Sequence, residues 1–404
     1  MNVTDFRQRV ETELRSGILP FWLNHTIDQE RGGFLGRISG DMTVDPAGEK
    51  GLILNARILW TFARAYRAYQ DPVYLVAAER AYEYLTTFFL DSEFGGYYWM
   101  LDCDGKPTQP RKQIYGQAFT VYALAEFYHA TGQAKALAQA LTLVEKIEAA
   151  GHDPVRGGYF EVYDRDWSLA ANQQLSAVDM DEPRSMNTHL HMLEAYAALL
   201  HVHEDATVRA RLRELINLFL DHIIDPVTHH FLLFFDEQWV PKSKTISFGH
   251  DIEGSWLLVE AAEILGESEL LARARQAAVQ MAQAVYEQGI DSDGGLLYEA
   301  DANCIHDSDK HWWPQAEAVV GFLNAHQISD EEHFLVAACR SWAFIEKFII
   351  DRKNGEWFWL VSRYGVPGTT QDKVGPWKCP YHNARACMEV IARLDKIAAE
   401  ALAQ

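Results

Sequence analysis

Gly157-Gly158-Tyr159-Phe160-Glu161-Val162-Tyr163-Asp164 joins a two-glycine turn to alternating aromatic and polar residues, a pattern typical of a short strand or hairpin. Related turns recur along the 404 residues, and each has an Asp three or four residues upstream. Successive turns lie 61 to 72 residues apart, so six units of similar length account for the chain. The other five turns are Gly32-Gly33-Phe34, Gly95-Gly96-Tyr97, His229-His230-Phe231, Gly294-Gly295-Leu296 and Gly355-Glu356-Trp357.

Each unit contains two segments with helical periodicity. Before the turn lies an amphipathic segment, such as residues 74–85 or 270–285, with apolar residues on one side and charges on the other. After the turn comes a segment that is apolar nearly all round, which indicates a buried helix. These apolar segments are 53–69, 118–129, 190–200, 252–265, 316–325 and 386–394.

Six pairs of one amphipathic and one buried helix can bury their apolar faces by closing into a ring with the apolar helices inside. We therefore predict an all-α fold, an (α/α)6 barrel with short β-hairpins between helices, forming one catalytic domain over residues 1–404. An open solenoid is the alternative, but no polar capping repeat is apparent at either end.

Composition excludes several classes of protein. Hydrophobic residues make up 48% of the chain, enough for a large core, which argues against disorder and coiled coils. The formal net charge of −21 and the absence of a Lys/Arg stripe make nucleic acid an unexpected partner. We find no signal peptide and no apolar stretch long enough for a membrane anchor. Five scattered cysteines argue against a disulfide framework, so we expect a cytoplasmic protein. We also expect a monomer or a weak homo-oligomer.

Polar, charged and aromatic residues gather where the six apolar segments begin. Parallel inner helices bring their N-terminal ends together, so these side chains should converge on one pocket. A helix N-terminus also offers free N–H groups and the positive end of its dipole, which suit hydroxyls and developing negative charge. The residues in question are Asn55, Arg57, Tyr115, Gln117, Asn187, His189, His191, His250, Asp251, Glu253, Trp312, Trp313, Gln315, Glu317, Trp377, His382, Asn383 and Arg385.

Spacing along each helix narrows this set. His250 and Glu253 are three residues apart and share a face. His191 shares a face with Asn187, which favours it over His189 as a functional residue.

Arg57 lies in an otherwise apolar helix. It would be a costly buried charge unless it meets a carboxylate or an anionic reaction intermediate. Pro314 suits the first turn of a helix and places the neighbouring tryptophans at the mouth of the pocket.

Two other chemistries use the same residues. Cys379 and His382 form a C-x-x-H motif that could bind zinc with another histidine of the pocket, although a single short spacing is weak evidence. Glu253 and Glu317 could serve as the paired carboxylates of a glycosidase, but the abundance of histidine argues against it. A non-catalytic sugar-binding barrel is a further alternative. Phosphate-binding glycine motifs and a nucleophile elbow are absent from the sequence.

Four motifs together resemble the N-acylglucosamine 2-epimerase superfamily, most closely its cellobiose 2-epimerase branch. The resemblance extends from residue 55 to residue 382 and implies an (α/α)6 barrel, in agreement with the repeat count. It also implies an isomerase that acts on unmodified sugars without a metal or redox cofactor. The motifs are Ser185-Met186-Asn187-Thr188-His189-Leu190-His191, Gly249-His250-Asp251-Ile252-Glu253, Trp312-Trp313-Pro314-Gln315-Ala316-Glu317-Ala318 and Pro376-Trp377-Lys378-Cys379-Pro380-Tyr381-His382-Asn383.

The resemblance also implies roles for individual residues. His250 and His382 become the two acid/base residues, since imidazoles can exchange protons at neutral pH. Arg57 joins them as a catalytic residue because its permanent charge can stabilise a cis-enediolate. The expected sugar-binding residues are Tyr115, Asn187, His191, Glu253, Trp313 and Trp377.

The implied reaction interconverts reducing-end glucose and mannose in β-1,4-linked disaccharides such as cellobiose and lactose. The alternative is a mannose 2-epimerase or mannose isomerase that acts on the free monosaccharide, because reprotonation at C1 instead of C2 yields a ketose. Two functions of Glu253 stay open from the sequence: it can orient His250 or bind a sugar hydroxyl.

Overall fold

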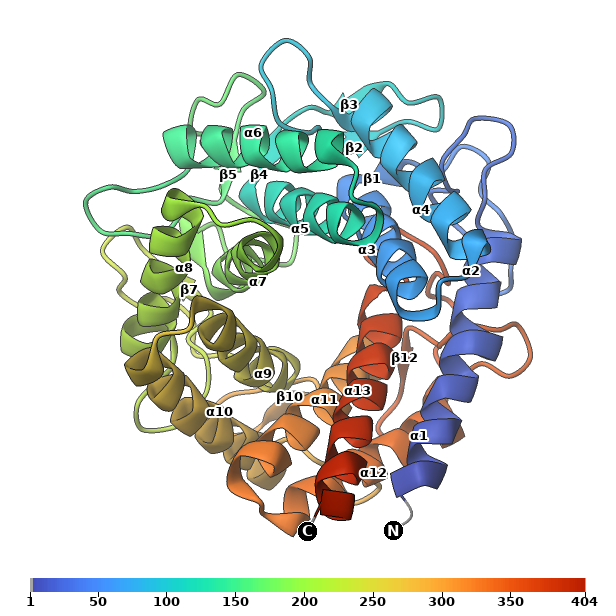
Figure 1. The fold of residues 1–404 in the computed structure, drawn as a ribbon, viewed down its shortest axis with the longest axis vertical. Coiled ribbons are helices and arrows are strands. Elements are labelled where there is room, and N and C mark those ends of the chain that lie inside the picture. Colours follow the sequence, from blue (N-terminus) through green and yellow to red (C-terminus); the bar gives the residue numbers. More distant parts are fainter. Residues whose placement is uncertain (1–2, 404) are drawn as a thin grey trace.

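The computed structural model describes residues 3–403 as two concentric rings of helices (Figure 1). Neighbouring inner helices contact one another around the whole circle, including α13 with α3, which confirms the barrel and excludes the open solenoid. The inner helices are α3 (Leu52–Tyr69), α5 (Ile114–Thr131), α7 (Met186–Val202), α9 (Phe248–Leu265), α11 (Trp312–Ser329) and α13 (Tyr381–Ala403).

The outer ring covers the inner one with amphipathic helices. The predicted segments 74–85 and 270–285 correspond to α4 and α10. α1 closes the circle by packing against α13, so the first and last helices are neighbours (Figure 1). The outer helices are α1 (Val3–Thr12) with α2 (Leu19–His25), α4 (Pro72–Tyr84), α6 (Ala134–Ala150), α8 (Ala206–Leu218), α10 (Ser268–Gln288) and α12 (Glu332–Phe344), and wider π-helical turns occupy Glu13–Ile18, Leu85–Phe89, Phe219–Ile223 and Ile345–Ile349.

The inner helices are buried on all sides near their N-termini, as their composition predicts. In α5 and α11 every residue of 114–127 and 312–325 is buried. Five of the six inner helices begin four or five residues earlier than predicted. The polar and aromatic residues that interrupt the apolar pattern lie inside the first helical turn and not before it.

Short antiparallel strands connect neighbouring units at the end of the barrel where the inner helices begin. The strand before each of α3, α5, α7, α9 and α11 pairs with a strand that follows the next unit's turn, and a bridge between Ile38 and Val374 joins the first unit to the last. The strands are β1 (Lys50–Gly51), β2 (Met100–Leu101), β3 (Pro107–Gln109), β4 (Lys112–Gln113), β5 (Val162–Tyr163), β6 (Arg184–Ser185), β7 (Phe234–Phe235), β8 (Ile246–Ser247), β9 (Glu299–Ala300), β10 (Ile305–Asp307), β11 (Lys310–His311) and β12 (Leu360–Val361).

The repeated turns are held from both sides. The upstream Asp meets a buried cation in five units, as in the 2.8 Å pair of Asp28 with Lys50 and the 3.0 Å pair of Asp91 with Lys112. Gly158 has a φ of +74°, and a Cβ there would lie 2.6 Å from the His189 ring, so only glycine fits. The turns thereby fix where each inner helix starts. Within residues 3–403, no helix has both the length and the apolar character that a membrane span needs.

Candidate active site

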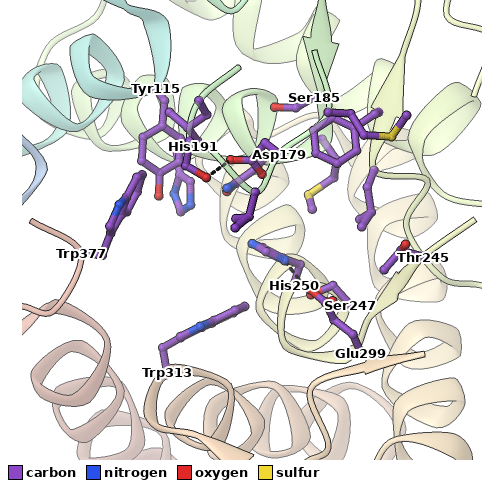
Figure 2. Close-up of a pocket in the computed structure, with 18 of the residues that line it drawn as sticks. Tyr115, Asp179, Ser185, His191, Thr245, Ser247, His250, Glu299, Trp313 and Trp377 are labelled. Carbon is purple, nitrogen blue, oxygen red and sulfur yellow. Dashed lines mark hydrogen bonds between the residues drawn. The ribbon is translucent and has the colours of Figure 1, made fainter. Parts of the chain in front are cut away.

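A cavity of about 590 Å³ opens at the N-terminal ends of the inner helices (Figure 2). Its volume is within the range of small-molecule sites. All nine residues that the sequence analysis selected for catalysis or sugar binding line it: Arg57, Tyr115, Asn187, His191, His250, Glu253, Trp313, Trp377 and His382. The structure therefore brings together side chains from all six inner units.

Other polar residues at these helix starts do not face the cavity, contrary to the expectation that the whole set converges there. Four of them hold the repeated turns, whereas Glu317 and Arg385 lie in a network with His382. The Gln117 amide accepts from the N–H of Tyr97 at 2.9 Å and donates to its carbonyl at 2.8 Å. His189 and Asp251 accept from the N–H of the corresponding aromatic residues in their units, and Gln315 repeats the two bonds of Gln117. Of the two neighbouring histidines, His191 lines the cavity and His189 holds a turn.

His382 lies in the first turn of α13 and is held by a carboxylate. Its Nδ1 is 2.7 Å from Oε1 of Glu317, which also accepts from Arg385 at 2.7 Å. Trp256 donates its indole N–H to the other oxygen of Glu317 at 3.0 Å. Burial, with nearby Arg57 and Arg385, lowers the pKa of His382 well below its usual range. Because Nδ1 is occupied, Nε2 is the His382 nitrogen available to a ligand.

His250 has a different partner. Its Nδ1 lies 2.7 Å from Oγ of Ser247, the last residue of β8, and Figure 2 shows the ring beside the cavity with Trp313 below it. Burial, together with the nearby His191, lowers the pKa of His250 to about 3. The rings of His250 and His382 both contact Trp313, with centroids 4.7 and 5.5 Å away. Two imidazoles from different helices therefore flank one indole at the cavity.

Glu253 shares a helix with His250 but does not orient it. Its Oε1 accepts from Arg385 at 2.6 Å and lies 3.8 Å from Nδ1 of His382. Burial and the nearby Glu317 raise the pKa of Glu253 to about 7. The sequence left two functions open for Glu253. The structure contradicts the first of them, the orientation of His250.

Arg57 is a buried cation without a carboxylate partner in the described part of the chain. Its side chain is 3% exposed, and one of its nitrogens donates to the Tyr115 hydroxyl at 3.0 Å. The guanidinium carbon lies 4.2 Å from the ring centre of Phe119 and 4.9 Å from that of Tyr381. Its Nε is buried with no hydrogen-bond partner. Aromatic faces compensate only part of the cost of burying this charge, so the site is electrostatically suited to an anion.

Arg385 has the opposite environment. It donates to Glu194, Glu253 and Glu317, so one guanidinium connects three buried carboxylates from three helices. Burial would raise the pKa of Glu194, but Arg385 and a 2.9 Å contact with His191 Nδ1 hold it at about 2. The sequence analysis did not identify Glu194. The only feature of the sequence that could have identified Glu194 is its position, three residues after His191 in an apolar helix.

The residues of the cavity do not fit a metal site. Glu253, Glu317 and His382 have ligand atoms within 4.8 Å of one another, but Arg385 already donates to both carboxylates. A metal ion there would face a permanent positive charge. Cys379, the other half of the C-x-x-H motif, has its Sγ 3.9 Å from a nitrogen of Arg57, which likewise disfavours a cation.

The same geometry argues against a glycosidase. Paired catalytic carboxylates must flank a glycosidic bond, with the sugar between them. Glu253 and Glu317 instead share one nitrogen of Arg385, at 2.6 and 2.7 Å. The guanidinium occupies the space that the substrate would need.

Comparisons with known proteins show which proteins this chain is similar to. The family model for N-acylglucosamine 2-epimerase matches residues 33–386. A cellobiose 2-epimerase from Bacteroides fragilis is 44% identical over 386 residues, covering 95% of this chain and 98% of the relative. One from Dictyoglomus turgidum is 38% identical, covering 98% and 100%. The solved structure of cellobiose 2-epimerase from Bacillus thermoamylovorans B4167 superposes with a TM-score of 0.93 at 39% identity, covering 96% of this chain and all of that one.

Proposed function

The chain belongs to the N-acylglucosamine 2-epimerase family, and from this premise we propose that it is a cellobiose 2-epimerase. It interconverts the reducing-end glucose and mannose of β-1,4-linked disaccharides such as cellobiose and lactose. Curated cellobiose 2-epimerases that match nearly the whole chain at 37 to 44% identity support this assignment.

The proposed mechanism rests on one observation, which is that two histidines contact the indole ring of Trp313. Inversion at C2 needs a proton removed from one face of the open-chain sugar and another delivered to the opposite face. His250 and His382 come from different helices and contact the same indole, and each has Nδ1 occupied and Nε2 available. Lowered pKa values leave both imidazoles unprotonated in the substrate-free site, so either can act as the base, and the partner that acts as the acid must take up a proton once the anionic intermediate forms. In our scheme one histidine takes the C2 proton while the other, protonated, supplies its replacement.

Arg57 supplies the positive charge that complements the anionic intermediate. Removal of the C2 proton places negative charge on the C1 and C2 oxygens of a cis-enediolate. Arg57 is the buried guanidinium at this cavity that lacks a carboxylate among the described residues, so its charge is free to stabilise that anion. Arg385, neutralised by three carboxylates, instead orients Glu317 and through it His382.

The lining of the cavity supports a disaccharide. The segments before α7 and α9 contribute Ser176, Asp179, Glu182, Ser243 and Thr245 to it. Hydroxyl and carboxylate groups of this kind can bond the hydroxyls of a second sugar ring. Asn187 and Trp377 also line the cavity and are available to the reacting ring.

The test is incubation of EDTA-treated enzyme with cellobiose or mannose in D2O, followed by NMR. The expected result is a mannose-type reducing end from cellobiose with deuterium at C2. Turnover of mannose alone would move the protein to the monosaccharide alternative with the same mechanism. Activity that returns only when zinc is added would refute the metal-free scheme.

A further inference from the structure

Ser247 is a buried residue at the junction of β8 and α9, directly before the helix that carries His250. Pairing of Ser247 with Glu299 of β9 fixes its backbone. Its Oγ lies 2.7 Å from Nδ1 of His250, and the hydrogen bonds found within residues 3–403 give this hydroxyl no second partner. Among the described residues, the imidazole is therefore the hydroxyl's hydrogen-bond partner.

The preceding unit contains a natural comparison. Ser185 occupies the same position before α7, also in extended backbone conformation. Its Oγ accepts from the N–H of Thr188 at 3.1 Å and caps the helix. Ser247 makes no such cap on α9. A serine cap stabilises a helix, so α9 gives up that stabilisation in exchange for the contact with His250.

The bond to Ser247 determines which nitrogen of His250 is free. With Nδ1 facing Oγ, only Nε2 is available to a ligand in the cavity. His382 is held in the same way, but by the carboxylate of Glu317, which can only accept. The two imidazoles therefore have Nδ1 partners of different charge. Removing the hydroxyl changes the restraint on His250 and leaves that on His382 intact.

We propose that Ser247 is a positioning residue for His250, holding its ring so that Nε2 meets C2 of the open-chain sugar on one face. This inference rests on the proposed function, in which His250 is one of two acid/base residues. Without the hydroxyl the imidazole can rotate about its side-chain bonds, and Nδ1 loses its partner in a buried site. His250 then exchanges protons with C2 more slowly, whereas His382 keeps its geometry.

The experiment separates the two histidines by hydrogen exchange. Wild type and Ser247→Ala are incubated in D2O with cellobiose and, separately, with its epimer that has mannose at the reducing end. NMR then measures deuterium at C2 of the recovered substrate and the yield of inverted product. In Ser247→Ala we expect inversion to fall about 10- to 100-fold, the effect of losing one buried hydrogen bond to a reacting group.

The two epimers should respond differently to Ser247→Ala. The epimer whose C2 proton faces His382 keeps exchanging with solvent while its inversion falls. The other epimer loses exchange and inversion together. Ser247→Thr keeps a hydroxyl in a backbone conformation that suits a β-branched residue, and we expect it to restore inversion to within a few-fold of wild type.

Ser185→Ala is the matched control. It removes a serine at the same position of another unit, so we expect a lower melting temperature with an unchanged ratio of exchange to inversion. Equal loss of exchange and inversion for both epimers in Ser247→Ala would overturn the inference, because general damage to the site acts in that way. If wild-type enzyme neither exchanges nor inverts either disaccharide, the proposed function itself fails, before any variant is compared.

Discussion

The substitution Arg57→Met tests whether the buried charge of Arg57 serves catalysis or stabilises the fold. Arg57 is 3% exposed, donates to the Tyr115 hydroxyl and the Cys379 sulfur, and has its guanidinium over the rings of Phe119 and Tyr381. Methionine keeps much of its length and removes the charge. If Arg57 stabilises the enediolate, the variant loses a preorganised donor aimed at a developing oxyanion, which costs about 10²- to 10³-fold in kcat, or about 3 to 4 kcal/mol.

The effect on stability should have the opposite sign. A buried ion costs several kcal/mol to desolvate, and two aromatic faces return about 2 kcal/mol each at best. With no carboxylate left unpaired by the change, Arg57→Met should keep or raise the melting temperature while kcat falls. Melting is followed by circular dichroism, and kcat by epimerisation of cellobiose.

Arg385→Met is the matched control, because Arg385 is equally buried but bonded to three carboxylates. Its loss leaves those charges uncompensated, and we expect destabilisation of about 3 to 5 kcal/mol. A fall in melting temperature for Arg57→Met as large as that for Arg385→Met would refute the reasoning. So would a kcat within a few-fold of wild type.

Three further predictions follow from the site and from the turns. His250→Ala and His382→Ala should each abolish turnover with an unchanged circular dichroism spectrum, and near wild-type activity in either variant would contradict the two-histidine scheme. Burial raises the pKa of Glu161 from 4.5 to about 8. Since folding then favours the protonated carboxyl, its contribution to stability is full below pH 4.5 and declines up to about pH 8. The melting temperature of the wild type should therefore fall more over that pH range than the melting temperature of Glu161→Gln. Gln117→Ala should lower stability by about 1 to 3 kcal/mol, measured by urea unfolding, because Tyr97 loses both backbone partners; activity per folded molecule should stay the same.

The fold was predictable because its determinants are local and repeated. Most of the repeated turns place glycine at positive φ, with His229 and Glu356 as exceptions, and a helix that is apolar all round must be buried. The period of the turns and the type of each helix are therefore both visible in the sequence. The same reasoning misplaced helix starts, since Tyr115 and Trp313 interrupt the apolar pattern while already lying in the first helical turn.

The site was predictable in its location and only partly in its contacts. Gln117 and Arg57 both stand near helix starts, yet one holds a turn and the other faces the cavity. That difference depends on how each helix is rotated about its axis in the ring. Ser247 and Glu194 escaped notice because their importance arises from atoms that they meet in space, and hydrophobic periodicity contains no information on such pairs.

The contact of α1 with α13 has a consequence for the order of assembly. α13 carries His382 and Arg385, and it reaches its place only when it docks between α11 and α3 with α1 behind it (Figure 1). During synthesis the first five inner helices can form an open arc, with Glu194, Glu253 and Glu317 lacking their shared guanidinium. Three unpaired carboxylates in that arc repel one another and weaken any premature closure. α13 therefore delivers the acid/base group and the cation that completes the ring in one step, so the site becomes competent only when this helix has docked.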